Sequence, residues 1–261
     1  MKIEFLTQDD SNYILPFFDE FVRHYGIEFQ IQRVSCCRAM GKRPRAKLLR
    51  ELLWLYGPLG FSRLAARSLF SKVLAAITPP QSDWTAHSIA QLCRAHGIPY
   101  EQVKNPNSAE FLAGLKQRAP DLIVSVACPY ILKEPVLQIA PLGCINIHNA
   151  PLPKYKGMMP VFWQMYHGEK KIGVTIHYMA AKVDEGDAIR QDELEIKPGE
   201  SLDCLIRRSK RYGAHCMAKV LREIRGDKVE VLHLNQAEST YFTFPTREQI
   251  QTFRNRGFRA I

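Results

Sequence analysis

A short stretch near the middle of the chain, residues 144–157 (CINIHNAPLPKYKG), combines groups suited to acid–base chemistry with a stiff basic loop. Asn146 and His148 end an apolar run that is typical of a buried strand. Residues two apart on a strand face the same side, so an amide and an imidazole point into one crevice. A lone histidine at a strand end is more often structural. The nearby asparagine and the loop stiffened by Pro151 and Pro153 favour a chemical role here.

A second group of polar residues accompanies the next predicted strand, which ends near His177. Seven residues later, Asp184 and Asp187 flank Gly186 in a predicted tight turn. This strand should lie beside the strand described above, so we expect Asp184 to meet His148 across the crevice. An amide donor, an imidazole and a carboxylate that orients the imidazole are suited to acyl transfer to an amine.

The surrounding sequence alternates between strand and helix patterns. Residues 2–7 predict a strand, a helix follows as far as Gly26, and residues 27–35 alternate like the next strand. This βαβ opening indicates an α/β protein with a doubly wound, mostly parallel sheet. The run DLIVSVAC (121–128) is typical of a buried parallel strand. Because no G-x-G-x-x-G motif joins a strand to a helix, a dinucleotide site of the usual form is not indicated.

We expect a catalytic domain over residues 1–210, and a C-terminal helix with an extended tail over residues 211–261. Within the first, residues 38–77 form a basic insertion with nine lysines and arginines and a single acid, Glu51. Its apolar spacing predicts two helices broken at Gly57 and the proline after it. Such a pair can lie on an anionic membrane surface, or it can pack on the domain and expose its basic face.

Composition narrows the class of protein. The 261 residues are 46% hydrophobic and 24% charged, which is enough for a sizeable core. No apolar run approaches the roughly 18 residues of a membrane-spanning helix, and the N-terminus is unlike a signal peptide. We expect a cytoplasmic protein, and peripheral contact with a membrane through the basic insertion is one of the two alternatives given above. Seven cysteines without a C-x-x-C pair predict no metal site. The net charge of +10 indicates either solubility or an anionic partner.

Two segments, INIHNAPLPKYKG (145–157) and GVTIHYMAAKVDEGDAI (173–189), resemble the folate-dependent formyltransferase family. That family includes glycinamide ribonucleotide, methionyl-tRNA and nucleotide-sugar N-formyltransferases. The resemblance implies a Rossmann-like formyltransferase fold and an enzyme of one-carbon metabolism that uses 10-formyltetrahydrofolate as formyl donor, without a metal. It also implies that Asn146, His148 and Asp184 are the catalytic residues, and that no cysteine acts as a nucleophile.

The resemblance further implies two binding regions. The folate-binding residues would be Tyr130, Ile131, Leu132, Ala180, Ala181, Lys182 and Val183. The residues bordering the acceptor amine would be Lys154, Tyr155, Lys156, Gly157 and His177. A homodimer is also an expectation from the family.

The acceptor amine is left open among several classes. The chain has only a tail where methionyl-tRNA formyltransferases typically carry a further domain, and its first strand lacks the glycine-rich loop of the glycinamide ribonucleotide enzymes. We therefore expect an amino sugar on a nucleotide or lipid carrier. Methionyl-tRNA and small amines such as hydroxyornithine are alternatives. Outside the enzymes, the basic charge is compatible with a nucleic-acid-binding protein, and a catalytically silent relative is a further alternative.

Overall fold

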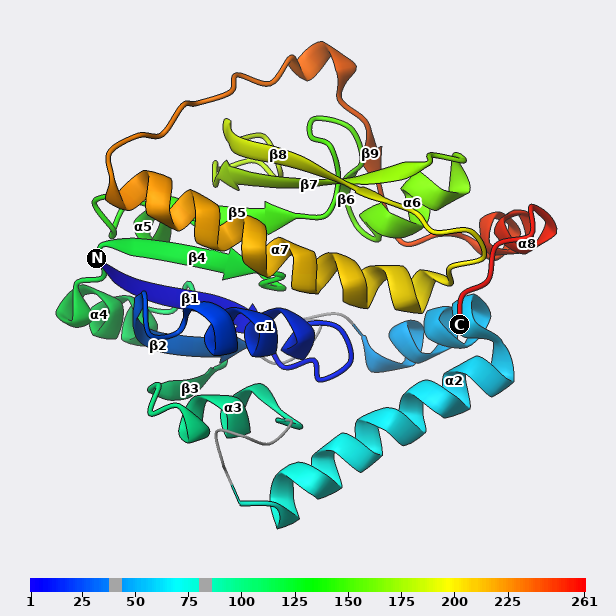
Figure 1. Ribbon diagram of the computed structural model, residues 1–261, viewed down its shortest axis with the longest axis horizontal. Helices are drawn as coiled ribbons and strands as arrows, with labels where there is room; N and C mark the ends of the chain where they lie inside the picture. The colour runs from blue at the N-terminus through cyan, green and yellow to red at the C-terminus, as the bar shows by residue number, and fades with distance from the viewer. Residues whose placement is uncertain (38–43, 80–85) are drawn as a thin grey trace.

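One seven-stranded sheet forms the centre of the molecule, with helices on both faces (Figure 1). The computed structural model describes residues 1–37, 44–79 and 86–261. The strand order is β3-β2-β1-β4-β5-β7-β8, and neighbouring strands are parallel except that β7 runs antiparallel to both β5 and β8. This confirms the predicted mostly parallel α/β fold. The strands of the sheet are β1 (Lys2–Gln8), β2 (Gln30–Cys37), β3 (Tyr100–Val103), β4 (Leu122–Val126), β5 (Cys144–His148), β7 (Lys171–Tyr178) and β8 (Ala188–Glu195).

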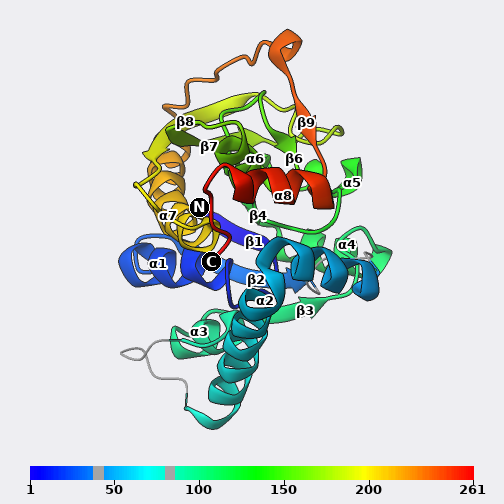
Figure 2. The same cartoon turned by 90° about the vertical axis from the view of Figure 1, so that its right-hand side faces the viewer.

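The helices form a layer on each face of the sheet (Figures 1 and 2). Helices α1, α3 and α7 contribute to the core cluster on one face, and α4 and α5 to the cluster on the other. Serine N-caps at Ser88, Ser108 and Ser201 begin three of these helices. The helices are α1 (Leu15–Tyr25), α2 (Arg45–Ile77), α3 (Ile89–Ala95), α4 (Ala109–Arg118), α5 (Glu134–Leu137), α6 (Pro160–Tyr166), α7 (Leu202–Arg225) and α8 (Arg247–Asn255).

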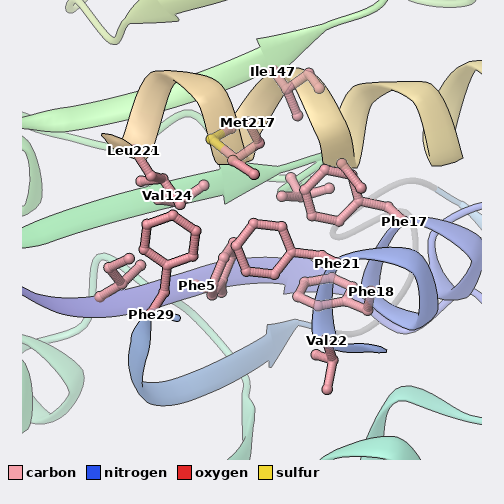
Figure 3. Close-up of a cluster of buried hydrophobic side chains, with 14 of the residues drawn as sticks. Phe5, Phe17, Phe18, Phe21, Val22, Phe29, Val124, Ile147, Met217 and Leu221 are labelled. Carbon is pink, nitrogen blue, oxygen red and sulfur yellow. The ribbon is translucent and has the colours of Figure 1, made fainter. Parts of the chain in front are cut away.

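An aromatic core holds the sheet against α1 and α7 (Figure 3). Phe5 of β1 meets Phe18 and Phe21 of α1 edge-on, with ring centroids 5.5 and 5.4 Å apart. Such pairs contribute about 0.5–1.5 kcal/mol beyond their burial. Ile147 of β5 enters the same cluster and packs so closely on α7 that a Cβ at Gly213 would lie 2.6 Å from its Cδ1. This packing fixes β5 and the residues on its opposite face.

A buried ion pair crosses the other face of the sheet. Glu4 of β1 is fully buried, and both of its carboxylate oxygens accept hydrogen bonds from Arg118 at 2.8 Å. Ser35 of β2 donates a further hydrogen bond to Glu4 at 2.9 Å. Because removing one partner of such a pair leaves a buried charge uncompensated, this bidentate contact constrains how α4 docks on the sheet.

The basic insertion is only partly within the described residues, since 38–43 lie outside them. Helix α2 covers most of the remainder, and at Gly57 the backbone leaves the helical region with φ 69° and ψ 172°. The proline that follows cannot donate the next helical hydrogen bond. The expected break at this point is therefore confirmed. No helix in the described part of the chain is both long enough and apolar enough to cross a membrane.

The C-terminal residues pack onto the body of the molecule rather than leaving it. Strand β9 (Tyr241–Phe242) pairs with β6 (Lys156–Gly157), and the 3-10 helix Gln236–Glu238 precedes it. Phe253 of α8 stacks on Phe162 of α6 with ring centroids 4.7 Å apart. The division we expected at residues 210/211 falls inside α7, which is one continuous helix, so no break in structure coincides with it.

Candidate active site

The antiparallel pairing of β5 with β7 brings the predicted polar residues together. Asn146 lies opposite His177, and His148 lies opposite Thr175. Strand alternation directs Ile147 into the core beneath α7, so Asn146 and His148 face the other side of the sheet. The expectation that the two motif-bearing strands are neighbours is confirmed. The site therefore lies on the face of the sheet opposite α7 and extends to the edge at which the parallel strands end.

A pinched loop, residues 179–187, carries Asp184 over this face. The Tyr178 N–H donates to the Asp187 carbonyl at 2.9 Å and closes the loop at its base. Gly186 is required there, because a Cβ would lie 1.7 Å from the Tyr178 carbonyl oxygen. Asp184 itself has φ +54°, a left-handed conformation that aspartate and asparagine tolerate better than most residues. The loop thus returns Asp184 from the end of β7 to the site.

His148 lies between a carbonyl and a carboxylate. Its Nε2 donates to the Tyr155 carbonyl at 2.9 Å, and its Nδ1 lies 3.6 Å from Asp184 Oδ2. Asp184 Oδ2 also accepts the Gly157 N–H at 3.0 Å. Because Nε2 must carry a proton to donate, a second proton on the ring sits on Nδ1 and points at the carboxylate. The expected approach of Asp184 to His148 is confirmed.

His177 sets the orientation of Asn146. Burial lowers the pKa of His177 to about 4, against an opposing effect of the Asp184 charge, so the ring is neutral near pH 7. Its Nδ1 donates to the Tyr178 carbonyl at 2.8 Å, which leaves Nε2 as an acceptor. Asn146 Nδ2 lies 3.2 Å from that nitrogen and donates to it. The second N–H of the Asn146 amide is left for a ligand.

The loop after β5 contributes some of its residues to the site and buries others. Tyr155, with φ +59°, supplies its carbonyl to His148. Gly157 has φ +91° and no room for a Cβ, and its N–H binds Asp184. Lys156 is buried, and its ammonium lies 3.1 Å from Oε1 of the partly exposed Glu185. Lys154 is half exposed, and its ammonium lies 3.7 Å from Glu238 Oε2.

Two loops could hold an aromatic cofactor. Tyr130, Leu132 and Met179 belong to one hydrophobic cluster, which joins the loop after β4 to the loop after β7. Ile131 is 64% exposed, and residues 180–183 are exposed as well. Among the described residues, the N–H groups of 181–183 have no hydrogen-bond partner. Apolar walls edged by open backbone donors suit a flat heterocycle. The residues that the structure describes contain no cluster of three or more His, Cys, Asp or Glu side chains that could hold a metal ion.

A neighbouring polar cluster was not anticipated from the sequence. Lys210 of α7 donates to Asn149 Oδ1 at 2.5 Å, and burial lowers the pKa of Lys210 to about 8. Burial raises the pKa of Asp10, which lies near the same ammonium. Asn149 Nδ2 is buried without a partner in the described structure. Asn149 directly follows His148 and could have been singled out, but Lys210 is one of many basic residues on a long helix.

Comparisons with known proteins identify the family of this chain. A family model described as "Formyl transferase" matches residues 77–221, which include Asn146, His148 and Asp184. The chain is 36% identical over 154 residues to the methionyl-tRNA formyltransferase of Alkaliphilus oremlandii, a match that covers 59% of this chain and 50% of that protein. The chain therefore spans about half the length of the curated relatives it matches.

Two solved structures share the fold. One is phosphoribosylglycinamide formyltransferase from Anaplasma phagocytophilum, 18% identical with a TM-score of 0.61, over 93% of this chain and 98% of that one. The other is an N-formyltransferase from Helicobacter canadensis with folinic acid and dTDP-3-aminofucose, 17% identical with a TM-score of 0.56, over 100% and 84%. Because the family model spans more than half of its residues, this chain belongs to the formyl transferase family.

Proposed function

We propose that the protein is an N-formyltransferase that moves a formyl group from 10-formyltetrahydrofolate to a primary amine. The observation that carries this proposal is the convergence of Asn146, His148 and Asp184 on one face of the sheet, with His148 3.6 Å from Asp184. An amide donor and an imidazole beside a carboxylate suit a reaction in which an oxygen gains negative charge while an amine loses a proton.

The donor would lie against the loops that follow β4 and β7. When bound, 10-formyltetrahydrofolate supplies a formyl carbon activated for attack by an amine. Tyr130, Ile131 and Leu132 would provide an apolar wall and backbone groups on one side of the pterin. The open N–H groups among residues 180–183 would bind the polar edge of the ring from the other side. These contacts would orient the donor toward His148.

The three central residues would divide the charge and proton changes among them. The second N–H of Asn146 and the Nδ1–H of a protonated His148 would donate to the formyl oxygen as it gains negative charge, each typically contributing a few kcal/mol, while the Nε2–H of His148 stays with the Tyr155 carbonyl. Asp184 would balance the imidazolium and accept the proton that the attacking amine loses. The bond between the formyl carbon and the folate nitrogen would then break, and the same proton would pass to that nitrogen, so that neutral tetrahydrofolate leaves. His177 would act as a positioning residue, because its neutral Nε2 holds the Asn146 amide.

We propose an amino sugar on a nucleotide or lipid carrier as the acceptor. The Helicobacter canadensis protein, whose structure contains dTDP-3-aminofucose, has the same fold. The net charge of +10 suits a phosphorylated carrier, and Lys210 of α7 binds Asn149, the residue after His148, whose amide nitrogen has no partner among the described residues. Methionyl-tRNA is a second candidate, favoured by the 36% identical relative.

The test is release of tetrahydrofolate in the presence of 10-formyltetrahydrofolate and a panel of acceptors that contains nucleotide-linked amino sugars and methionyl-tRNA. We expect release, and a formamide product by mass spectrometry, with an amino sugar. His148→Gln should lose turnover by at least about 10²-fold while it still binds 5-formyltetrahydrofolate by calorimetry. His24→Gln, which changes an exposed histidine on α1, is the matched control and should react as the wild type does.

Turnover with methionyl-tRNA alone would select the second candidate. Folded protein that neither binds the folate nor releases tetrahydrofolate with any acceptor would refute the proposal. Full turnover by His148→Gln would refute the role given to His148.

A further inference from the structure

The second part of helix α2, after the kink at Gly57, turns its apolar side chains outward. Five large apolar side chains are between 46% and 78% exposed there: Leu59, Leu69, Phe70, Val73 and Ile77. Their spacing repeats at three, four or seven residues over most of the segment, so they share one face of the helix. We call this the outer face of α2. A contiguous exposed apolar face of this kind marks an interaction site.

The opposite side of the helix is fastened to the body of the molecule. The Arg67 guanidinium binds Asp203 of α7 at 2.7 and 3.2 Å, and Ser68 accepts a hydrogen bond from Asn12 at 2.7 Å. At the end of the helix, Gln91 donates to the Thr78 hydroxyl at 2.8 Å. These contacts hold the outer face away from the sheet, and both views show the helix extending from the body (Figures 1 and 2).

The outer face is bordered by positive charge. Arg63 and Lys72 are exposed on the same part of the helix. Glu51 is the single acidic residue of α2, and it is buried in the first part of the helix. Between α2 and the C-terminal residues, a hollow of about 280 Å3 beside Gly60 is lined by residues that include Arg63, Arg254 and Arg259. Within the described residues of α2, this apolar surface has a cationic border and no exposed acid, so it is complementary to an anionic interface.

We propose that α2 docks this outer face on the surface of an anionic lipid bilayer. Apolar side chains such as Phe70 and Ile77 would enter the boundary between head groups and acyl chains, while Arg63 and Lys72 would contact lipid phosphates. A second copy of the chain, paired through the same face, would set these cations against each other without an acid to match them. A nucleic acid would leave the five apolar side chains without partners. The bilayer satisfies both the apolar and the cationic groups.

The test is co-sedimentation with phosphatidylcholine vesicles that contain phosphatidylglycerol, compared with vesicles of phosphatidylcholine alone. We expect binding to the anionic vesicles to be at least about tenfold tighter and to weaken as salt is raised. The triple variant Leu69→Gln, Phe70→Gln, Ile77→Gln should bind the anionic vesicles at least about tenfold more weakly. The matched control is Ile27→Gln with Val231→Gln, which removes exposed apolar side chains elsewhere and should bind as the wild type does.

Circular dichroism checks that each variant is folded. The variant Arg63→Gln with Lys72→Gln retains the apolar face and should lose several-fold in affinity for anionic vesicles, which tests the proposal separately.

Absence of vesicle binding by the wild type would overturn the proposal, as would undiminished binding by the folded triple variant. A dimer in light scattering that the triple variant dissociates, without vesicle binding, would assign the face to a second copy. Salt-sensitive RNA binding without vesicle binding would assign it to a nucleic acid. The outcome does not depend on formyl transfer.

Discussion

Replacing His177 by glutamine should flatten the dependence of folding stability on pH between pH 4 and 6.5. Burial lowers the pKa of His177 to about 4 in the folded protein, whereas an imidazole in the unfolded chain titrates near 6.5. The unfolded chain therefore binds this proton first as pH falls. The stability associated with the neutral ring is fully present above pH 6.5 and is lost progressively as pH falls toward 4.

The size of the effect follows from the difference between the two pKa values. A difference of about 2.5 units, at about 1.36 kcal/mol per unit, corresponds to about 3 kcal/mol. Between pH 7 and pH 4 the wild type should therefore lose about 3 kcal/mol more stability than His177→Gln. The imidazole is 2% exposed, so solvent screens this contribution little.

Urea unfolding followed by circular dichroism, repeated across this pH range, measures the difference. Subtracting the variant curve from the wild-type curve removes the contribution of carboxylates that titrate in both proteins. His177→Phe is a second non-titrating variant with a different shape and should give the same difference in slope. If the curves of the wild type and both variants are parallel, His177 is not a buried neutral group. The orientation inferred for Asn146 would then be wrong as well.

Three further predictions concern Asp184, the loop that carries it, and the core. Asp184→Asn keeps a residue that tolerates φ +54° but removes the charge beside the His148 imidazole, so kcat/KM should fall about 10²–10³-fold if the proposed role is right; a loss below threefold would contradict this role. Gly186→Ala places a Cβ where the Tyr178 carbonyl lies, so calorimetry should show loss of folate binding, and wild-type affinity would contradict the pinched loop. Arg118→Gln deprives the fully buried Glu4 of its charge partner and should lower the free energy of unfolding by about 3–5 kcal/mol, whereas a loss under 1 kcal/mol in urea unfolding would show the pair to be unimportant.

The sequence by itself determined the local features on which the site is built. Strand alternation requires Asn146 and His148 to share a face, because side chains two apart on a strand point the same way. The backbone limits of Gly57 and the proline after it require a break in α2. The apolar run of β4 requires burial on both faces. Each of these properties depends on neighbours along the chain, so each was predictable.

Tertiary structure alone decided which distant groups meet and in what charge state. His177 is neutral because burial removes water from the ring, which the residue type does not reveal. Lys156 is buried and paired with Glu185, while Lys210 of α7 binds Asn149. Arg67 and its polar neighbours form hydrogen bonds with the body of the molecule, so the apolar side chains of α2 are left on its outer face. Strand register, helix docking and desolvation set these properties, and all three depend on residues that are far apart along the chain.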